Sequence, residues 1–382
     1  MKIGQRLASL VISDIRSMSR ACDAVGGINL GQGICDLPTP PPVAAGAKQA
    51  IDENRVIYSA PEGILPLRRA IAAKVERLYD LRYDPASEVV VTAGATGGFA
   101  AACLALFDPG DEVILFEPYY GYHLNTMLTL GLSPRLVPTL PPEWQFDPAA
   151  LERAIGPKTR GIVVCSPGNP SGKVFDRAEL DLIAKLAEEH DLLLVTDEIY
   201  EHILFDGTEH VPLATRGNAR ARTVSLSGFS KTFAITGWRL GYLTAPAELS
   251  RRIVIAHDLL YVCAPTPLQH AMLPGLAMPN SYYDEMTASY AEKRAILCDA
   301  LADAGLTPHR PRGAYYVLAD IRKLGFSDAK SACMALLDRS KIAAIPGTSF
   351  YEDPVGQTLA RFCFAKEVDV LEEAARRIRL LA

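Results

Sequence analysis

One stretch decides how this chain is interpreted: Ser227-Gly228-Phe229-Ser230-Lys231-Thr232-Phe233-Ala234-Ile235-Thr236-Gly237-Trp238-Arg239-Leu240-Gly241-Tyr242. Its lysine, Lys231, stands among small residues that let a backbone approach a bound molecule closely. If Lys231 is to attack a carbonyl, its amine must be unprotonated. A partly desolvated, cation-rich pocket is needed to favour that state. Most lysines lie in surface loops, and the stretch alone would favour that alternative. The other motifs of the chain decide against it.

The composition is that of an ordinary globular protein. A chain of 382 residues predicts two domains, and 49% hydrophobic with 22% charged residues is typical of globular chains. A net charge of -5 leaves no basic excess, so nucleic acid is not an expected partner. The start of the chain lacks a signal-peptide core, and no apolar run is long enough for a membrane. The 8 cysteines include no Cys-x-x-Cys pair, so we expect a cytoplasmic protein without a metal site or a disulfide framework.

A strand, a glycine turn and a helix start follow one another near residue 94. Residues 88–92 form a β-branched run typical of a buried strand, and small residues follow. Unpaired N–H groups at such a helix start, together with the helix dipole, favour an anion. A plain tight turn is the alternative. With Lys231 nearby in the fold, we favour a phosphate cradle formed by Ala95 and Thr96, with Gly94 allowing the turn.

Three further apolar runs predict buried strands, at residues 112–116, 161–165 and 192–196. Polar or aromatic residues follow their ends: Tyr120, Asn169, Asp197 and Tyr200. Each has a structural alternative, namely a core tyrosine, an Asn-Pro turn or an aspartate that caps a helix. A carboxylate at the carboxyl end of a buried parallel strand lies where α/β folds bind ligands.

An arginine stands inside an apolar strand near the C-terminus. Residues 359–365 predict a strand, and Arg361 lies within it. A buried guanidinium is costly unless an anion pairs with it. The partner is either an acidic residue of the protein or a bound carboxylate, which guanidinium geometry fits well.

Taken together, these motifs resemble those of the class I/II aminotransferases, which are pyridoxal 5′-phosphate (PLP) enzymes of fold type I in the aspartate aminotransferase superfamily. The resemblance extends from Gly31 to the C-terminal helix, and six separated motifs agree in order, which is rarely accidental. The motifs are most similar to those of kynurenine/glutamine and methionine aminotransferases.

The resemblance implies an α/β fold. A large PLP-binding domain is expected over residues 41–279, with a mostly parallel, seven-stranded-type sheet flanked by helices. A smaller α+β domain is expected from both termini, residues 1–40 and 280–382. Residues 1–30 are expected to include a short helical arm with Leu7, Leu10, Val11 and Ile15 on one face. A symmetric homodimer is also implied, because Tyr58 matches a tyrosine that serves the neighbouring subunit's cofactor.

The resemblance also assigns roles to individual residues. The catalytic residues would be Lys231, which forms the Schiff base and moves the α-proton, Asp197, which holds the pyridine nitrogen protonated, and Tyr200, at the phenolic oxygen. The residues that would bind PLP are Lys231, Gly94, Ala95, Thr96, Tyr120, Asn169, Asp197, Tyr200, Ser227, Ser230, Arg239 and, from the neighbouring subunit, Tyr58. The substrate carboxylate would be bound by Gly33, Asn169 and Arg361. A core aromatic is an equal alternative for Tyr58. In this family the peptide bonds before Pro118 and Pro170 are commonly cis.

Three positions depart from the family pattern. Gly228 stands where a phosphate-binding serine is common, so Ser227 or Ser230 is expected to substitute. Thr96 stands where aspartate-specific relatives carry a lysine. Arg312 precedes Gly313, and no role is assigned to it.

The replacement at Thr96 favours a donor with a neutral or aromatic side chain. Tyr120, Tyr316 and Phe350 would line an apolar pocket in which an unpaired carboxylate would be costly. An arginine of the N-terminal arm would restore the missing cation, and the candidates are Arg6, Arg16 and Arg20.

The implied activity is transfer of an amino group from an L-amino acid to a 2-oxo acid through PLP and its pyridoxamine form. A PLP-dependent β-lyase that acts on cysteine conjugates would use the same catalytic groups and is the alternative enzyme. A non-catalytic PLP-binding regulator is the alternative from another class. Such proteins usually carry a DNA-binding domain, for which this chain leaves no length.

Overall fold

The main sheet has eight strands in the order β2-β9-β8-β7-β6-β3-β4-β5. The computed structural model describes residue 7 and residues 14–381. Neighbours from β8 to β4 are parallel, whereas β9 is antiparallel to both of its neighbours and β5 is antiparallel to β4. The strands are β2 (Val89–Thr92), β3 (Glu112–Glu117), β4 (Ser133–Leu140), β5 (Gln145–Phe146), β6 (Thr159–Cys165), β7 (Leu193–Asp197), β8 (Thr223–Gly228) and β9 (Gly241–Thr244).

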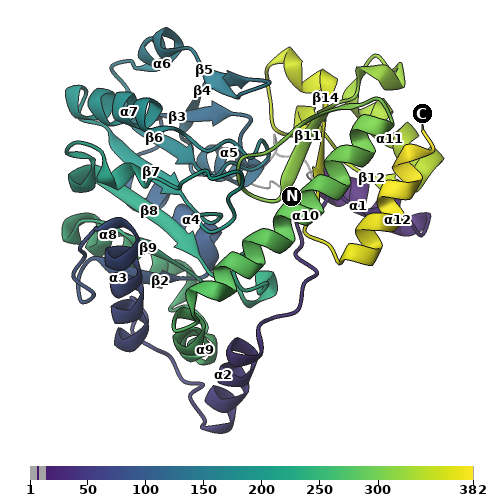
Figure 1. Cartoon of the computed structure of the whole chain (residues 1–382). Helices are drawn as coiled ribbons and strands as arrows, with labels where there is room; N and C mark the ends of the chain where they lie inside the picture. The colour runs from purple at the N-terminus through teal and green to yellow at the C-terminus, as the bar shows by residue number, and fades with distance from the viewer. Residues whose placement is uncertain (1–6, 8–13, 382) are drawn as a thin grey trace, which may run out of the picture.

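The strands carry apolar side chains on both faces of the sheet, and helices therefore cover both faces. In β6, Val163 packs in the core beneath α4, α5 and α8, whereas Ile162 and Val164 pack in the core beneath α6 and α7. Figure 1 shows the strands fanning between these helices, with α2 and α9 side by side at one end. The helices are α2 (Pro41–Asp52), α3 (Leu65–Tyr79), α4 (Gly94–Leu106), α5 (Gly121–Thr129), α6 (Pro148–Ala154), α7 (Arg177–Glu189), α8 (Ala247–Tyr261) and α9 (Thr266–Leu276).

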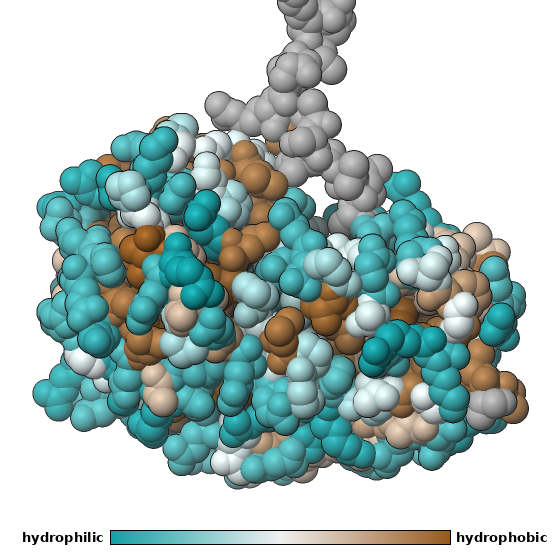
Figure 2. Space-filling model, turned by 90° about the horizontal axis from the view of Figure 1, so that it is seen from above, coloured by the Kyte–Doolittle hydropathy of each residue, from teal (hydrophilic) through white to brown (hydrophobic). Residues whose placement is uncertain are grey.

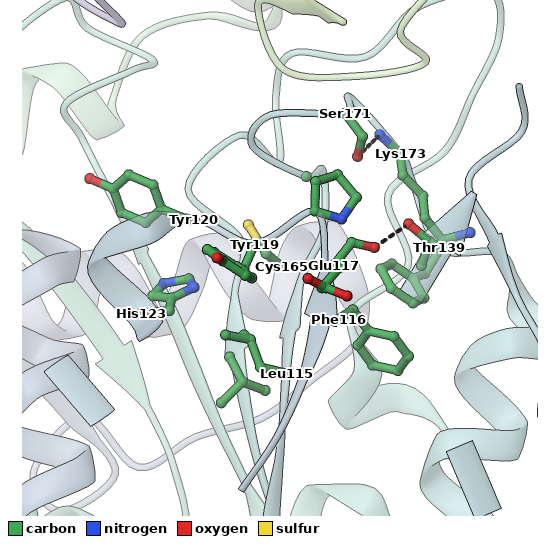
Figure 3. Close-up of a pocket in the computed structure, with 14 residues that line it drawn as sticks. Leu115, Phe116, Glu117, Tyr119, Tyr120, His123, Thr139, Cys165, Ser171 and Lys173 are labelled. Atoms are coloured by element: carbon green, nitrogen blue, oxygen red, sulfur yellow. Dashed lines mark hydrogen bonds between the residues drawn. The ribbon is translucent and has the colours of Figure 1, made fainter. Parts of the chain in front are cut away.

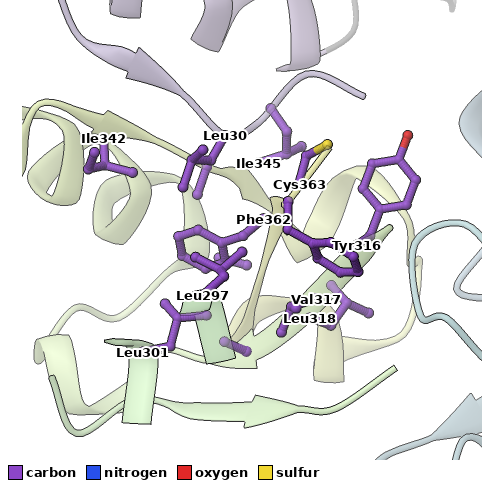
Figure 4. Close-up of a cluster of buried hydrophobic side chains, with 14 of the residues drawn as sticks. Leu30, Leu297, Leu301, Tyr316, Val317, Leu318, Ile342, Ile345, Phe362 and Cys363 are labelled. Carbon is purple, nitrogen blue, oxygen red and sulfur yellow. The ribbon is translucent and has the colours of Figure 1, made fainter. Parts of the chain in front are cut away.

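A smaller antiparallel sheet, in the order β10-β11-β14-β13, lies beside the first. Helix α10 runs from the neighbourhood of α9 to this sheet (Figure 1) and buries Leu297 and Leu301 against it. Figure 4 shows these leucines facing Phe362 in a closed apolar core. The remaining elements are α1 (Asp14–Ala24), β1 (Ile28–Asn29), α10 (Asn280–Asp303), β10 (Thr307–His309), β11 (Tyr316–Asp320), α11 (Ala329–Ser340), β12 (Ile342–Ala343), β13 (Ile345–Pro346), β14 (Leu359–Cys363) and α12 (Val368–Arg379).

The α/β fold with a mostly parallel sheet is confirmed, with two corrections. The short β5 adds an eighth strand to the expected seven. In addition, the prolines of residues 138–142 predict a turn-rich connection after a strand near residues 135–137, whereas β4 continues through Leu140, because its residues pair with β3 and then with β5. The expected domain division stays a prediction, although residues 41 and 280 coincide with the first residues of α2 and α10.

The N-terminal arm is partly described. Helix α1 begins at Asp14, and Ile15 packs against the core of the smaller sheet as expected. Leu7 is exposed and lies in a turn, which contradicts its place in a helical arm, and Leu10 and Val11 lie outside the described residues.

The molecular surface is mostly polar on the face shown in Figure 2, with hydrophobic side chains in small groups between. Among the helices of residues 14–381, none combines the length and the apolar character that crossing a bilayer requires.

Candidate active site

A cavity of about 480 Å³ is lined by residues of both sheets. Asp197 ends β7, Lys231 follows β8 and Arg361 lies inside β14. The cavity therefore brings together residues that are far apart in the sequence. Eleven of the fourteen predicted site residues line it: Gly33, Ala95, Thr96, Tyr120, Asn169, Asp197, Tyr200, Ser230, Lys231, Arg239 and Arg361.

Lys231 is an amine held in a desolvated, aromatic environment. Its Nζ lies 5.7 Å from the centre of the Tyr200 ring and 5.3 Å from that of Tyr315. Burial lowers the pKa of Lys231 to about 8, and the charge of Arg239 acts in the same direction, whereas Asp197 opposes it. Within the described chain, no carboxylate lies within salt-bridge distance of this amine. A neutral, nucleophilic lysine is therefore accessible close to neutral pH.

Asp197 is positioned by a histidine that the sequence did not single out. His123 Nε2 lies 3.0 Å from Asp197 Oδ2, and Oδ1 accepts the backbone N–H of Ile199 at 3.2 Å. The Tyr120 and His123 rings meet edge to face at 5.2 Å, and Figure 3 shows both on the same side of the end of β3. The only sequence signal was a histidine three residues after Tyr120, at the start of α5. This contact fixes the carboxylate at the edge of the cavity.

The start of α4 offers an anion site next to an arginine. Ala95 and Thr96 line the cavity, and Arg239 reaches the same turn from the segment after β8. Gly94 lies behind them with φ +75°, and a Cβ there would lie 2.6 Å from Nη2 of Arg239. The positive φ and this close approach both favour glycine. A helix start and a guanidinium at one point suit a phosphate group.

Arg361 is a buried cation without an acidic partner in the described chain. Its Nη1 donates to Asn169 Oδ1 at 2.9 Å and its Nη2 donates to the carbonyl of Gly31 at 2.6 Å, while Nε has no partner there. The guanidinium lies over the rings of Tyr316 and Phe350, at 4.4 and 4.7 Å from their centres. An acidic residue was the alternative partner, and none of residues 14–381 lies within salt-bridge distance. A bound carboxylate would complete this charge.

Three predicted site residues do not line the cavity: Gly94, Ser227 and Tyr58. Ser227 is a correction: its hydroxyl donates to Glu201 Oε1 at 2.5 Å, so it is not available to a phosphate, whereas Ser230 lines the cavity. Tyr58 is 80% exposed, so the core-aromatic alternative is wrong, and its role toward a neighbouring subunit stays a prediction.

One other expectation, for Phe350, is also corrected. Phe350 is fully buried behind Arg361 and does not line the substrate cavity, whereas Tyr120 and Tyr316 do. Arg312 turns outward, and its Nε donates to Thr208 Oγ1 at 3.3 Å. The peptide bonds before Pro118 and Pro170 are both cis, as predicted.

A buried polar cluster beneath the site was also missed. Glu201, the residue after Tyr200, accepts hydrogen bonds from Lys74 Nζ at 2.5 Å, Tyr79 at 2.6 Å and Tyr242 at 3.2 Å, besides that of Ser227. The pair Lys74–Glu201 joins α3 to the loop after β7 across 127 positions of sequence. No local pattern reveals such a pairing.

The sequence matches the family Aminotransferase class I and II over residues 25–378. The chain belongs to this family. The match takes in both sheets and all fourteen predicted site residues. The protein is accordingly an enzyme of the transaminase type, and its family uses PLP.

Individual relatives agree along nearly the whole chain. A probable N-succinyldiaminopimelate aminotransferase of Mycobacterium tuberculosis is 37% identical, covering 99% of this chain and 98% of that protein. A methionine aminotransferase of Escherichia coli is 33% identical over 98% and 97% of the two chains. The solved structure of the mycobacterial N-succinyldiaminopimelate aminotransferase superposes with a TM-score of 0.96 over the full length of both chains.

Proposed function

We propose that this aminotransferase uses PLP bound to Lys231 to move the amino group of a neutral or aromatic L-amino acid to a 2-oxo acid. The observation that carries this proposal is the half-buried Lys231, which lies in one cavity with Asp197 and Arg361 and has no acidic partner within salt-bridge distance among the described residues. Burial lowers its pKa to about 8. An amine that is neutral near the working pH is suited both to bind a carbonyl and to exchange a proton.

The residues present fit the cofactor. Arg239, the start of α4 and Ser230 would hold its phosphate, and Asp197, fixed by His123, would face its ring nitrogen. Gly94 supports this assignment, because a side chain there would collide with Arg239. When bound, the cofactor supplies an electron sink that stabilises negative charge at the substrate's α-carbon.

The chain itself performs the remaining tasks. Arg361 and Asn169 bind the α-carboxylate and thereby orient the substrate's α-carbon toward Lys231. The Nζ of Lys231 accepts the α-proton and returns it to the cofactor side as general base and acid. Tyr200 packs against the lysine and stays protonated, because burial raises the pKa of its hydroxyl well above its ordinary value. The aromatic walls of Tyr120 and Tyr316 favour an apolar substrate side chain.

We further propose that the enzyme is a homodimer. The exposed Tyr58 and the exposed apolar end of α8 support this assignment. By resemblance, Tyr58 would complete the phosphate site of the neighbouring subunit.

The test combines a substrate panel with a variant. The purified protein should be yellow and should convert neutral and aromatic amino acids to oxo acids with 2-oxoglutarate or pyruvate as acceptor. Lys231→Ala should lose both properties, whereas Lys48→Ala, at an exposed lysine of α2, should keep them. Release of a thiol from cysteine conjugates without amino transfer would favour the β-lyase alternative. Borohydride labelling of a different lysine would refute the assignment of Lys231.

A further inference from the structure

Helix α1 places a cation at the cavity that the proposed reaction does not use. Arg16 lines the cavity together with Ile15 and with the segment Gln32–Ile34, which follows β1. Its backbone belongs to the smaller sheet's side of the molecule, because Met18 and Cys22 of the same helix are buried in that core.

The helix is fixed firmly enough to hold Arg16 in this place. Asp14, at its first turn, accepts a hydrogen bond from Ser349 at 2.9 Å and pairs with Lys330 at 3.3 Å. Ser19 bonds to Gln32 at 3.3 Å and to Asn29 at 2.9 Å, so the helix and the cavity segment are joined. The acidic residue nearest in sequence, Asp14, is thus engaged elsewhere.

The charges of the cavity are unbalanced. Of the described residues, four cations line it, namely Arg16, Lys231, Arg239 and Arg361, against a single carboxylate, Asp197. In the proposed function, Lys231 binds the cofactor, Arg239 binds its phosphate and Arg361 binds the substrate's α-carboxylate. Among the described residues, Arg16 has neither an ion pair nor a side-chain hydrogen bond. One cation is therefore left for a second anionic group of a bound substrate.

We propose that Arg16 binds the side-chain carboxylate of a dicarboxylic substrate, the 2-oxo acid acceptor or the corresponding acidic amino acid. This inference rests on the proposed function, and it names the class of one of the two substrates. The buried Arg361 guanidinium would bind the α-carboxylate, and the exposed Arg16 lines the same cavity. Its planar fork suits a carboxylate.

The same residue reconciles acidic and neutral substrates in one cavity. Because Arg16 is exposed on the helix, its side chain turns to solvent at little cost when a neutral side chain occupies the apolar wall. Thr96, at the start of α4, supplies no charge of its own. Arg16 thus supplies the positive charge that a lysine provides in aspartate-specific relatives at the position of Thr96.

The kinetic test compares Arg16→Gln with Arg20→Gln, an exposed arginine one turn further along α1 that does not line the cavity. Arg16→Gln should lower kcat/KM for glutamate and 2-oxoglutarate about 10- to 100-fold, the range expected for losing a hydrogen-bonded charge partner. Values for methionine and phenylalanine should stay within about threefold, and Arg20→Gln should leave both classes unchanged. Arg16→Lys should recover part of the loss. An equal fall for acidic and neutral substrates, or no fall for the acidic ones, would overturn the proposal.

A binding measurement separates this inference from the proposed function. Calorimetry should show that glutarate, a dicarboxylate that cannot react, binds the cofactor-loaded wild type more tightly than butanoate, and that Arg16→Gln abolishes the difference. If the wild type transaminates no amino acid but keeps this difference, the proposed function fails and the Arg16 assignment stands. If glutarate and butanoate bind equally to the wild type, the Arg16 assignment fails, whatever the activity. If the wild type does prefer glutarate, comparing the activities with aspartate and 2-aminoadipate will show which side-chain length the cavity prefers.

Discussion

Gly33 shows how closely the cavity wall depends on a single missing side chain. A Cβ at Gly33 would lie 1.8 Å from the hydroxyl oxygen of Tyr316 and 2.8 Å from the carbon that carries it. We therefore expect Gly33→Ala to displace the Tyr316 ring from its position over Arg361 and to lower kcat/KM at least tenfold. Removing the hydroxyl relieves the closer contact, so Gly33→Ala/Tyr316→Phe should be more active than Gly33→Ala. Steady-state kinetics of the two single variants and the double variant check this, and an additive loss would contradict it.

Lys231 gives a prediction about pH. Burial favours the neutral amine, so the pKa is lowered to about 8 and deprotonation occurs at lower pH than for an exposed lysine. In the cofactor-free protein, reductive methylation at Lys231 should rise with pH and reach half of its maximum near pH 8. Mass spectrometry of the peptide that contains Lys231 measures this, with the exposed Lys48 as internal control. A midpoint above pH 10 would show that the amine is solvated.

At the residue scale, the sequence predicted identities better than orientations. Asp197, Asn169 and Arg361 line one cavity as predicted, since Asp197 and Asn169 stand at or just after the end of an apolar run and Arg361 is a charge inside one. The choice between Ser227 and Ser230 required the structure, since side chains of a strand alternate between its faces and Ser227 lies on the face toward Glu201.

At the scale of elements, the Lys74–Glu201 pair holds α3 against the loop that carries Tyr200. Both side chains are about 5% exposed or less. Burial opposes both charges, but their mutual attraction outweighs it, so the pKa of Lys74 is raised and that of Glu201 is lowered. Removing one partner leaves a buried charge, so Lys74→Met should destabilise the protein by about 3 kcal/mol. Chemical denaturation measures this loss.

The double-variant cycle provides the control for that prediction. Lys74→Met/Glu201→Gln should lose much less stability than the sum of the two single variants, because neither charge is left alone. The exposed pair Lys185–Glu189 on α7, at 3.6 Å, is the matched surface case, and Lys185→Met should have almost no effect. Additive losses at the buried pair would show that the two side chains act independently.

The elements themselves were predicted well where their pattern is local. The ends of β3, β6 and β7 follow from apolar runs bounded by turn residues. The length of β4 did not follow from its sequence, because its prolines suggest a turn and only pairing with β3 and β5 keeps the strand extended. The pairing of β4 with its neighbours therefore determined its length, which strand propensity alone did not predict.

At the scale of the whole molecule, the apolar end of α8 is an exposed surface next to the active site. Leu259 is 79% exposed, and Ile255, Leu260, Tyr261 and Val262 are also exposed hydrophobic residues. The helix lies against the start of α4, since His257 Nε2 accepts the backbone N–H of Ala93 at 3.0 Å. Apolar groups gathered in this way favour association with a second copy.

The neighbouring loop extends this surface. Ile57 and Tyr58 are 77% and 80% exposed, and the loop is held to α9 by a hydrogen bond from Gln269 Nε2 to Ser59 Oγ at 3.0 Å. A symmetric dimer would bury both the loop and the end of α8, and it would bring Tyr58 to the other subunit's phosphate site. Dimer formation and cofactor binding should therefore be linked.

We expect Leu259→Glu to convert the dimer into a monomer, because it places a charge in the centre of an apolar contact. Sedimentation velocity of the wild type and the variant measures this directly. Leu380→Glu, at a leucine that is 73% exposed at the far end of the chain after α12, introduces the same charge away from the surface and should remain dimeric. The monomeric variant should also bind PLP more weakly than the dimer, and Tyr58→Phe should reproduce part of that loss while remaining dimeric. A wild type that sediments as a monomer with full cofactor affinity would show that each subunit's site is complete without Tyr58 of its neighbour.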